Sequence, residues 1–333
     1  RIQSMKKYKV LIPDRSIDAD VEKKVFGGRY EILTPNVKQL SEIEDRVWSS
    51  VDGILAWHDF EYKSHLLSKL SKCKGIVRIG TGYDNINLEA ALKLGIIISN
   101  VPDYGTNDVA DHTWGLILSM ERGIVKYNRS LLQKGEWTWE KGFNLERIQN
   151  KCLGIIGFGR IGVAVARRAK AFDMEVLFYD PYVPIGIEKS LGVYRTHNLP
   201  DLAKNSDIIT IHAPLTKETI GLINDSFFKN MKFGSSIFNT ARGEIIELDA
   251  LHIALKENKV KFAGLDVIEE EPINYNHPLF EAWVKDEAWI KDRLVITPHT
   301  AFYNEQSYNE MKQKAAEELK RIIEHESPLN KVI

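Results

Sequence analysis

Short apolar runs rich in β-branched residues alternate, over the first hundred residues, with stretches in which apolar positions recur every three or four residues. The runs have the length and composition of strands, and the stretches have the spacing of amphipathic helices. The expected strands are residues 10–13, 30–33, 51–56, 75–79 and 96–100. The expected helices are residues 20–26, 37–48, 64–70 and 88–94. This alternation predicts a parallel sheet with helices packed on its faces.

The same alternation returns between Cys152 and Pro298. There the expected strands are residues 152–156, 175–179, 193–194, 207–212, 236–239, 262–267 and 294–297, with helices such as 201–205 and 248–257. Two helical segments at residues 109–122 and 125–134 stand between the alternations, and a Lys/Glu-rich helix is expected at 306–325. Because that last helix follows the whole second alternation, we expect it to pack back on the first.

The length of 333 residues exceeds what one hydrophobic core usually supports, so the two alternations predict two domains. The expected fold class is α/β, with two doubly wound parallel sheets of the Rossmann or flavodoxin type. The first domain would comprise residues 5–100 together with 303–333, and the second would comprise residues 101–302.

Composition and charge narrow the class of protein. Hydrophobic residues make up 44% of the chain and charged residues 27%, near the averages of globular proteins. A formal net charge of -1 gives no electrostatic reason to expect binding to nucleic acid or to an anionic membrane. Cys73 and Cys152 lie in or beside apolar runs, which favours reduced thiols over a disulfide or a metal site. With no apolar run of membrane-spanning length and no signal-peptide pattern, we expect a cytoplasmic protein.

The first strand of the second alternation leads directly into Gly157, Gly159 and Gly162, which have the G-x-G-x-x-G spacing. In a dinucleotide-binding loop, the first glycine permits the tight turn and the second lets the backbone approach a pyrophosphate. The third lets the next helix pack closely on the sheet, with its N-terminus toward the phosphates. A plain βαβ unit could carry such glycines by chance, but here strand, loop and helix follow in the order that the motif requires.

Asp180 follows the next expected strand, where an acidic residue binds the ribose 2′-hydroxyl of a dinucleotide. A carboxylate at this point would repel the 2′-phosphate of NADP, so the sequence predicts NAD as the cofactor. No arginine follows directly, although Lys189 and Arg195 lie within loop reach.

Several ordered motifs resemble those of the D-isomer-specific 2-hydroxyacid dehydrogenases, and the resemblance spans nearly the whole chain. Besides the glycine loop, residues 202–215 resemble the family's second signature and residues 231–243 its third. Within the family, the likeness is greatest to the C-terminal-binding-protein branch, through residues 77–86, 177–182 and 297–306. The resemblance implies an NAD-dependent oxidoreductase that acts on a small 2-oxo or 2-hydroxy acid.

The resemblance also implies a catalytic trio of Arg242, Glu271 and His299, with the active site in a cleft between the two domains. Arg242 would hold the substrate's carboxylate or carbonyl oxygen with its planar guanidinium. His299 would give a proton to the carbonyl oxygen as hydride arrives, and would remove the hydroxyl proton in the reverse direction. Glu271 would hydrogen-bond the other ring nitrogen and so fix the tautomer.

Further positions carry over from the family's motifs. The loop of Gly80, Thr81 and Gly82 would bind the substrate carboxylate through backbone N–H groups, and Arg78 would add a second contact, as in the C-terminal-binding branch. The positions implied to contact NAD are Thr81, Gly157, Phe158, Gly159, Arg160, Ile161, Gly162, Asp180, His212, Ala213, Pro214, Thr219, Thr240, Ala241, Arg242, Asp266 and His299. Asp266 would lie near the nicotinamide amide. No metal is implied.

Two departures from the branch pattern concern the substrate pocket and its surroundings. Phe302 stands where the branch typically has a tryptophan, which keeps an aromatic wall but lacks the indole N–H. The segment from Glu271 to His299 is longer than usual and includes residues 283–289, expected as a short helix with two tryptophans. A dimer contact or surface padding is favoured over a lid for this segment.

The expected protein is a homodimer that pairs through helices within residues 103–148 and takes a small 2-oxo/2-hydroxy acid as substrate. The chief alternative is an NAD-sensing corepressor that docks short peptides on its first domain, as members of the C-terminal-binding branch do. Phosphite oxidation uses a similar trio and stays open as a reaction. A regulated phosphoglycerate dehydrogenase is less expected, since the sequence stops at Ile333 without a further regulatory domain.

Overall fold

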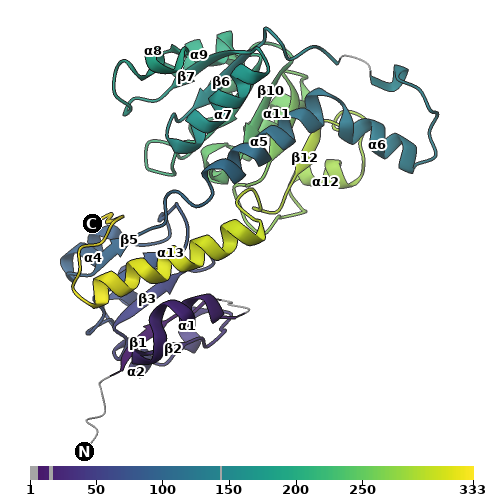
Figure 1. The fold of residues 1–333 in the computed structure, drawn as a ribbon. Coiled ribbons are helices and arrows are strands. Elements are labelled where there is room, and N and C mark those ends of the chain that lie inside the picture. The colour runs from purple at the N-terminus through teal and green to yellow at the C-terminus, as the bar shows by residue number, and fades with distance from the viewer. Residues whose placement is uncertain (1–6, 15–17, 143–144) are drawn as a thin grey trace, which may run out of the picture. The chain divides into compact units, whose positions relative to one another are not determined.

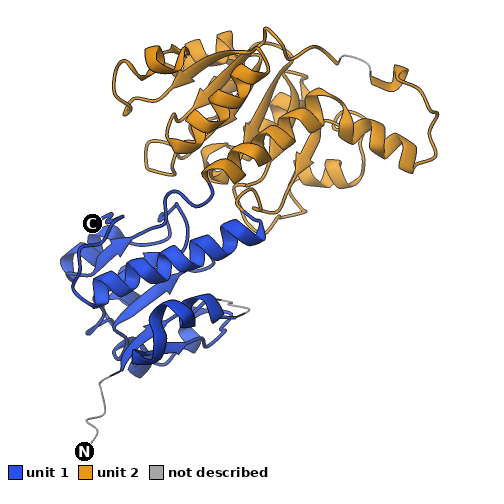
Figure 2. Cartoon of the chain, in the orientation of Figure 1, with its two compact units in different colours: residues 1–105, 303–333 blue, residues 106–302 orange. Residues whose placement is uncertain are grey.

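The computed structural model describes residues 7–14, 18–142 and 145–333, and the chain divides into two compact units (Figures 1 and 2). Unit 1 comprises Arg1–Gly105 and Tyr303–Ile333, and unit 2 comprises Thr106–Phe302. Residues 5 and 6, where the first predicted domain begins, lie outside the described residues. Each unit is an α/β fold built on a parallel sheet, which confirms the predicted fold class.

Among its described residues, unit 1 has one parallel sheet in the strand order β2-β1-β3-β4-β5. The strands are β1 (Tyr8–Leu11), β2 (Tyr30–Leu33), β3 (Gly53–Ala56), β4 (Gly75–Arg78) and β5 (Ile97–Ser99). The helices are α1 (Asp20–Phe26), α2 (Asp45–Trp48), α3 (Ser64–Leu67), α4 (Leu88–Lys93) and α13 (Glu305–Ile323). This strand order is that of a flavodoxin-like sheet.

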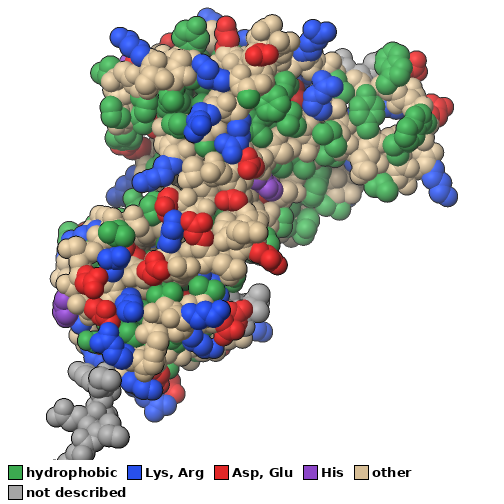
Figure 3. Space-filling view, viewed as in Figure 1, with side chains coloured by type: hydrophobic (Ala, Val, Ile, Leu, Met, Phe, Trp, Pro, Cys, Tyr) green, Lys and Arg blue, Asp and Glu red, His purple; other side chains and the backbone are tan. Residues whose placement is uncertain are grey.

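The helix α13 packs closely on the sheet of unit 1. A side chain placed at Gly53 would come within 2.7 Å of Leu319, and one placed at Gly75 would come within 2.7 Å of Ile322. Glycines in β3 and β4 therefore let this distant segment of the chain approach the sheet. Acidic and basic side chains are interspersed on the visible face of unit 1, consistent with the near-zero net charge (Figure 3).

The described part of unit 2 has a parallel sheet in the order β12-β11-β10-β9-β6-β7-β8. Its strands are β6 (Cys152–Ile156), β7 (Glu175–Tyr179), β8 (Tyr194–Arg195), β9 (Ile208–Ile211), β10 (Ser235–Asn239), β11 (Val260–Leu265) and β12 (Leu294–Ile296). The helices are α5 (Thr106–Glu121), α6 (Ile124–Leu132), α7 (Arg160–Ala171), α8 (Ile187–Leu191), α9 (Leu199–Asn205), α10 (Asp225–Asn230), α11 (Leu248–Lys256) and α12 (Pro278–Val284). The order reverses beside β6, as in a Rossmann fold, and ligands of such sheets bind at the carboxyl ends of the strands near this reversal.

Several predicted helices differ in extent from those observed; the one expected at residues 64–70 ends at Leu67, and two others differ more. Residues 37–48 form a single-turn 3₁₀ helix at Leu40–Glu42 and the short α2, because the Glu42 carboxylate accepts hydrogen bonds from the N–H groups of Lys38 and Gln39 and closes a local turn. The helix expected at 283–289 is instead α12, which begins earlier and ends at Val284. Pro278 at its first turn and the capping ring of His277 set its start.

Candidate coenzyme and acid/base sites

The glycine loop after β6 has the geometry that a dinucleotide site requires. Gly157 has a φ of 88°, and a side chain there would lie 2.4 Å from the backbone nitrogen of Ala213. A side chain at Gly162 would lie 2.3 Å from the carbonyl oxygen of Gly157, so the start of α7 packs directly on the loop. No heavy atom lies within 4 Å of the position where Gly159 would carry a side chain. The loop is therefore tight where it turns and open where a pyrophosphate would approach.

Asp180 stands directly after β7, beside this loop. One carboxylate oxygen accepts a hydrogen bond from Phe158 N–H at 2.7 Å, and the other accepts one from Tyr182 N–H at 2.8 Å. The oxygen bound by Tyr182 also accepts the Val183 N–H at 3.3 Å, so the oxygen bound by Phe158 is the one with a lone pair left for a ribose hydroxyl. Arg160 and Ile161 begin α7, with Arg160 exposed at the helix N-terminus. These residues fit the ribose and phosphate groups of NAD.

The loop after β9 holds the next predicted group. Its His212 Nε2 pairs with Thr210 Oγ1 at 2.9 Å, and burial lowers the pKa of His212 to about 3. The ring is therefore neutral at pH 7 and suits a wall of the adenine pocket better than an acid/base role. Thr219 donates to the carbonyl oxygen of Pro214 at 2.7 Å, which closes the loop that begins at the buried Ala213.

The loop after β10 carries Arg242. Asn239 clamps this loop, since its Nδ2 donates to the Arg242 carbonyl oxygen at 2.8 Å and its Oδ1 accepts from Ala241 N–H at 3.0 Å. The buried hydroxyl of Thr240 lies 2.9 Å from that of Thr113 on α5. Both contacts place Arg242 at the carboxyl end of the sheet, as its position in the sequence predicts.

His299 and Glu271 meet at the same end of the sheet. His299 Nδ1 lies 2.8 Å from Glu271 Oε2, and both side chains are partly exposed. His299 has a φ of 51°, a left-handed conformation that is uncommon outside glycine and is held here by its N–H bond to the Asp266 carbonyl oxygen at 2.8 Å. A carboxylate on one ring nitrogen orients the imidazole and fixes its tautomer.

Asp266 has a role that the sequence did not indicate. It is buried, and its carboxylate accepts hydrogen bonds from the Thr297 hydroxyl at 2.6 Å and from the N–H groups of Thr300 and Ala301, each at 2.9 Å. His112 on α5 supports the same cluster through a contact of 2.9 Å with Thr297. Asp266 thus holds the loop that carries His299, with the half-buried Phe302 immediately after it.

In unit 1, the predicted substrate residues are Arg78, which ends β4, and the loop of residues 80–82 after it. Arg78 is buried and donates to the carbonyl oxygen of Ile79. A side chain at Gly80, which has a φ of 136°, would lie 1.7 Å from Arg78 Nη1, so only glycine lets the guanidinium occupy this place. Thr81 donates to the carbonyl oxygen of Val101 at 3.3 Å, and Gly82 is half-buried beside it.

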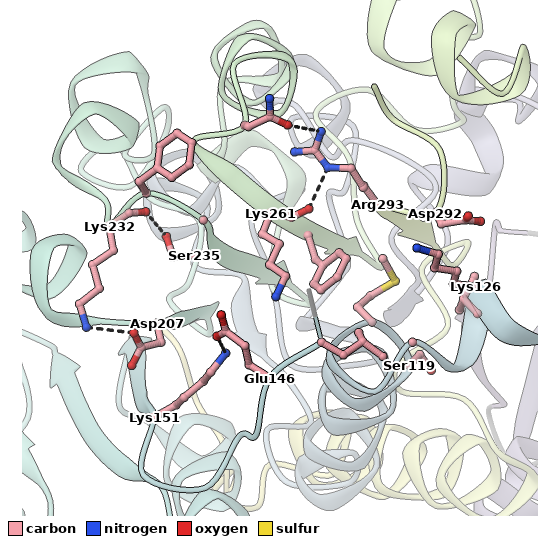
Figure 4. Close-up of a pocket in the computed structure, with 18 of the residues that line it drawn as sticks. Ser119, Lys126, Glu146, Lys151, Asp207, Lys232, Ser235, Lys261, Asp292 and Arg293 are labelled. Atoms are coloured by element: carbon pink, nitrogen blue, oxygen red, sulfur yellow. Dashed lines mark hydrogen bonds and ion pairs between the residues drawn. The ribbon is translucent and has the colours of Figure 1, made fainter. Parts of the chain in front are cut away.

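The structure also has a cavity of about 850 Å³ in unit 2, at the amino-terminal ends of β10, β11 and β12 (Figure 4). Its lining includes basic side chains, but Lys151 pairs with Glu146 at 2.7 Å and Lys232 pairs with Asp207 at 3.0 Å. The cavity lies at the opposite edge of the sheet from Asp180 and His299. Within the described residues, no group of three or more His, Cys, Asp or Glu could hold a metal ion, and no helix is long and apolar enough to cross a membrane.

The chain is similar to known proteins over most of its length. The family model "D-isomer specific 2-hydroxyacid dehydrogenase, NAD binding domain" matches residues 114–301. D-3-phosphoglycerate dehydrogenase of Methanocaldococcus jannaschii is 36% identical over 97% of this chain, which spans 59% of that relative's length. Glyoxylate reductase of Pyrococcus furiosus is 37% identical over 86% of this chain and 83% of the relative. D-lactate dehydrogenase of Aquifex aeolicus, solved with NAD and lactic acid, superposes with a TM-score of 0.84 at 28% identity, over 97% of this chain and 98% of that one.

Proposed function

Because this chain belongs to the D-isomer-specific 2-hydroxyacid dehydrogenase family, we propose that it is an NAD-dependent oxidoreductase that interconverts a small 2-oxo acid and the D-2-hydroxy acid. The observation that carries this proposal is the 2.8 Å contact between His299 and Glu271. An imidazole held by a carboxylate, on the sheet edge that also carries the dinucleotide loop, is suited to proton transfer beside a hydride carrier.

Each residue has a defined part in the proposed reaction. NAD supplies or accepts the hydride. Arg242 binds the carboxylate or carbonyl oxygen of the substrate and polarises the C=O bond. His299 moves the proton to or from the same oxygen, while Glu271 stabilises the imidazolium. Arg78 and the backbone of residues 80–82 bind the substrate carboxylate.

The proposal extends to a homodimer that pairs through the segment 103–148. No side chain of α6 is buried, and the segment that follows it has Trp137 and Trp139, which are 91% and 81% exposed. Hydrophobic side chains gather over this part of unit 2 in Figure 3. Exposed aromatic residues of this kind are typical of protein interfaces.

The function is tested by following NADH oxidation with a panel of 2-oxo acids that includes glyoxylate, pyruvate and hydroxypyruvate. We expect turnover with at least one acid. His299→Ala should lower that turnover by roughly two to four orders of magnitude, the usual effect of removing a positioned proton donor, and should leave NADH bound. The control is His197→Ala, which alters an exposed histidine of unit 2 and should leave turnover unchanged.

Other outcomes separate the alternatives. A corepressor-like scaffold would bind NADH and a Pro-x-Asp-Leu-Ser peptide but would oxidise no NADH with any acid. A phosphite dehydrogenase would reduce NAD with phosphite alone. Full turnover by the His299→Ala protein would remove this residue from the mechanism.

A further inference from the structure

Arg195, a residue of β8, binds the backbone of the segment that follows Asp180. This side chain is only 8% exposed, and its guanidinium points into the loop of residues 180–184 rather than toward solvent. Nη1 donates to the carbonyl oxygens of Asp180 and Val183, each at 3.3 Å, and Nη2 donates to that of Pro184 at 2.7 Å. Three carbonyl groups of one loop are therefore bound by one planar group, which a flexible ammonium could not match.

Two further contacts fix the guanidinium itself. Nε donates to Glu188 Oε2 at 3.1 Å, and this carboxylate also accepts the Gly186 N–H at 3.1 Å. The guanidinium carbon lies 4.8 Å from the centre of the fully buried Phe178 ring. Four of the five guanidinium N–H donors thus have protein acceptors, so Arg195 is not poised to bind a 2′-phosphate.

The same network reaches the glycine loop. The Phe178 ring stacks on Phe158 with centroids 3.9 Å apart and planes 12° from parallel. Phe158 lies between Gly157 and Gly159, and its N–H donates to Asp180 at 2.7 Å. Arg195, the Asp180 loop and the phosphate-binding turn consequently form one packed cluster in which the Asp180 carboxylate has a defined place.

We propose that Arg195 is a positioning residue for coenzyme selection, which holds Asp180 in the place where it binds a ribose 2′-hydroxyl and repels a 2′-phosphate. This inference rests on the proposed use of NAD. The ribose hydrogen bond and the repulsion both depend on distance, so a carboxylate on a loosened loop loses part of each. Arg195 acts through Asp180 and does not touch the reacting atoms.

Arg195→Lys tests the proposal because it keeps the charge and removes the planar fork. Binding of NADH and NADPH is measured by fluorescence titration, which needs no 2-oxo acid. We expect the affinity for NADH to fall roughly tenfold, the effect of one lost hydrogen bond to a charged group, and that for NADPH to change less than about twofold. Turnover at saturating NADH should stay within about twofold, since the acid/base pair is untouched.

Two controls separate positioning from a general effect. Lys189→Met removes an exposed cation of the neighbouring helix α8 and should leave the NADH to NADPH affinity ratio unchanged. In an Asp180→Ala background, Arg195→Lys should change the ratio by less than about twofold, because the residue through which it acts is gone.

The outcomes are distinct. The role of Arg195 would be overturned if Arg195→Lys weakened the binding of NADH and NADPH equally and so left their affinity ratio unchanged. It would also be overturned if Lys189→Met shifted that ratio by the same amount. The proposed function would stand in both cases. If the unaltered protein binds no NADH, the proposed function fails and this inference fails with it. Should Arg195→Lys prove poorly folded by circular dichroism, Glu188→Gln, which weakens the guanidinium's anchor, should shift the ratio in the same direction.

Discussion

Asp14 is a fully buried carboxyl in unit 1 that follows β1, at the same edge of the parallel sheet as the predicted substrate residues at the end of β4. One of its oxygens accepts a hydrogen bond from Trp57 N–H at 3.0 Å, and burial raises the pKa of Asp14 from 3.8 to about 6. A raised pKa means that the folded protein binds this proton more tightly than the unfolded chain does. The free energy of unfolding should therefore fall as the pH rises from 3.8 to about 6.

Asp14→Asn should remove this dependence. The difference in unfolding free energy between the variant and the unaltered protein should change by about 2–3 kcal/mol in favour of the variant from pH 3.8 to pH 7. This is the free energy that corresponds to raising the pKa from 3.8 to about 6. Urea unfolding at both pH values measures the difference. Asp45→Asn, at an exposed site of unit 1, is the control, and a constant difference between Asp14→Asn and the unaltered protein at all pH values would contradict the argument.

Local contacts hold the predicted site residues in place. The contact of His299 with Glu271 is direct. The loop that carries Arg242 is held by Asn239 at the same sheet edge. Arg78 is buried against Gly80, which explains why glycine stands in this loop independently of any ligand.

The helices α1 and α13 are joined by a buried ion pair. Lys312 on α13 is 1% exposed, and its ammonium lies 3.4 Å from the carboxylate of Glu22 on α1, whose side chain is also 1% exposed. The ammonium also lies 3.3 Å from Asp18, which precedes α1. A pair of this kind holds two distant segments in one register, although it need not be more stable than an apolar pair.

Lys312→Met should lower the free energy of unfolding by roughly 3–5 kcal/mol, because it leaves the Glu22 carboxylate buried without its partner. The double variant Glu22→Met, Lys312→Met should recover most of that loss. Lys314→Met alters a more exposed ion pair of the same helix and should cost less than about 1 kcal/mol. Urea unfolding checks all three, and equal losses for Lys312→Met and Lys314→Met would show that burial of the pair is not the cause.

Helix α6 and the segment after it bear on the assembly of the whole molecule. Sedimentation of the unaltered protein should give a dimer. The double variant Trp137→Ser, Trp139→Ser should be shifted toward monomer, because the polar side chains remove exposed apolar area that a second copy could cover. Leu92→Ser changes an exposed apolar residue of α4 and should leave the dimer intact. A dimer that survives the paired tryptophan substitutions would exclude this segment as a major contact.

The sequence by itself determined the elements and loops whose signals are local. The bounds of β2, β6, β7 and α1 match those predicted from apolar runs and helical spacing. The roles of Gly157 in the tight turn and of Gly162 in the close packing of the next helix were predicted from their spacing, because both are requirements of the backbone at those positions. Where a local hydrogen bond competes with helical spacing, as at Glu42, the same reasoning predicted a helix over residues 37–48 of which only the last turn, α2, is α-helical.

Only the tertiary structure decided what several polar side chains do. From the sequence, Arg195 was a cation within reach of a 2′-phosphate, and Asp266 was a coenzyme contact. In the fold, Arg195 binds the backbone of residues 180–184, and Asp266 binds the loop of His299. These partners are brought together by the pairing of β7 with β8 and of β11 with β12. A sequence pattern records which face of a strand a residue occupies. The direction of a long polar side chain depends instead on which carbonyl and N–H groups the tertiary structure brings within hydrogen-bonding distance of it.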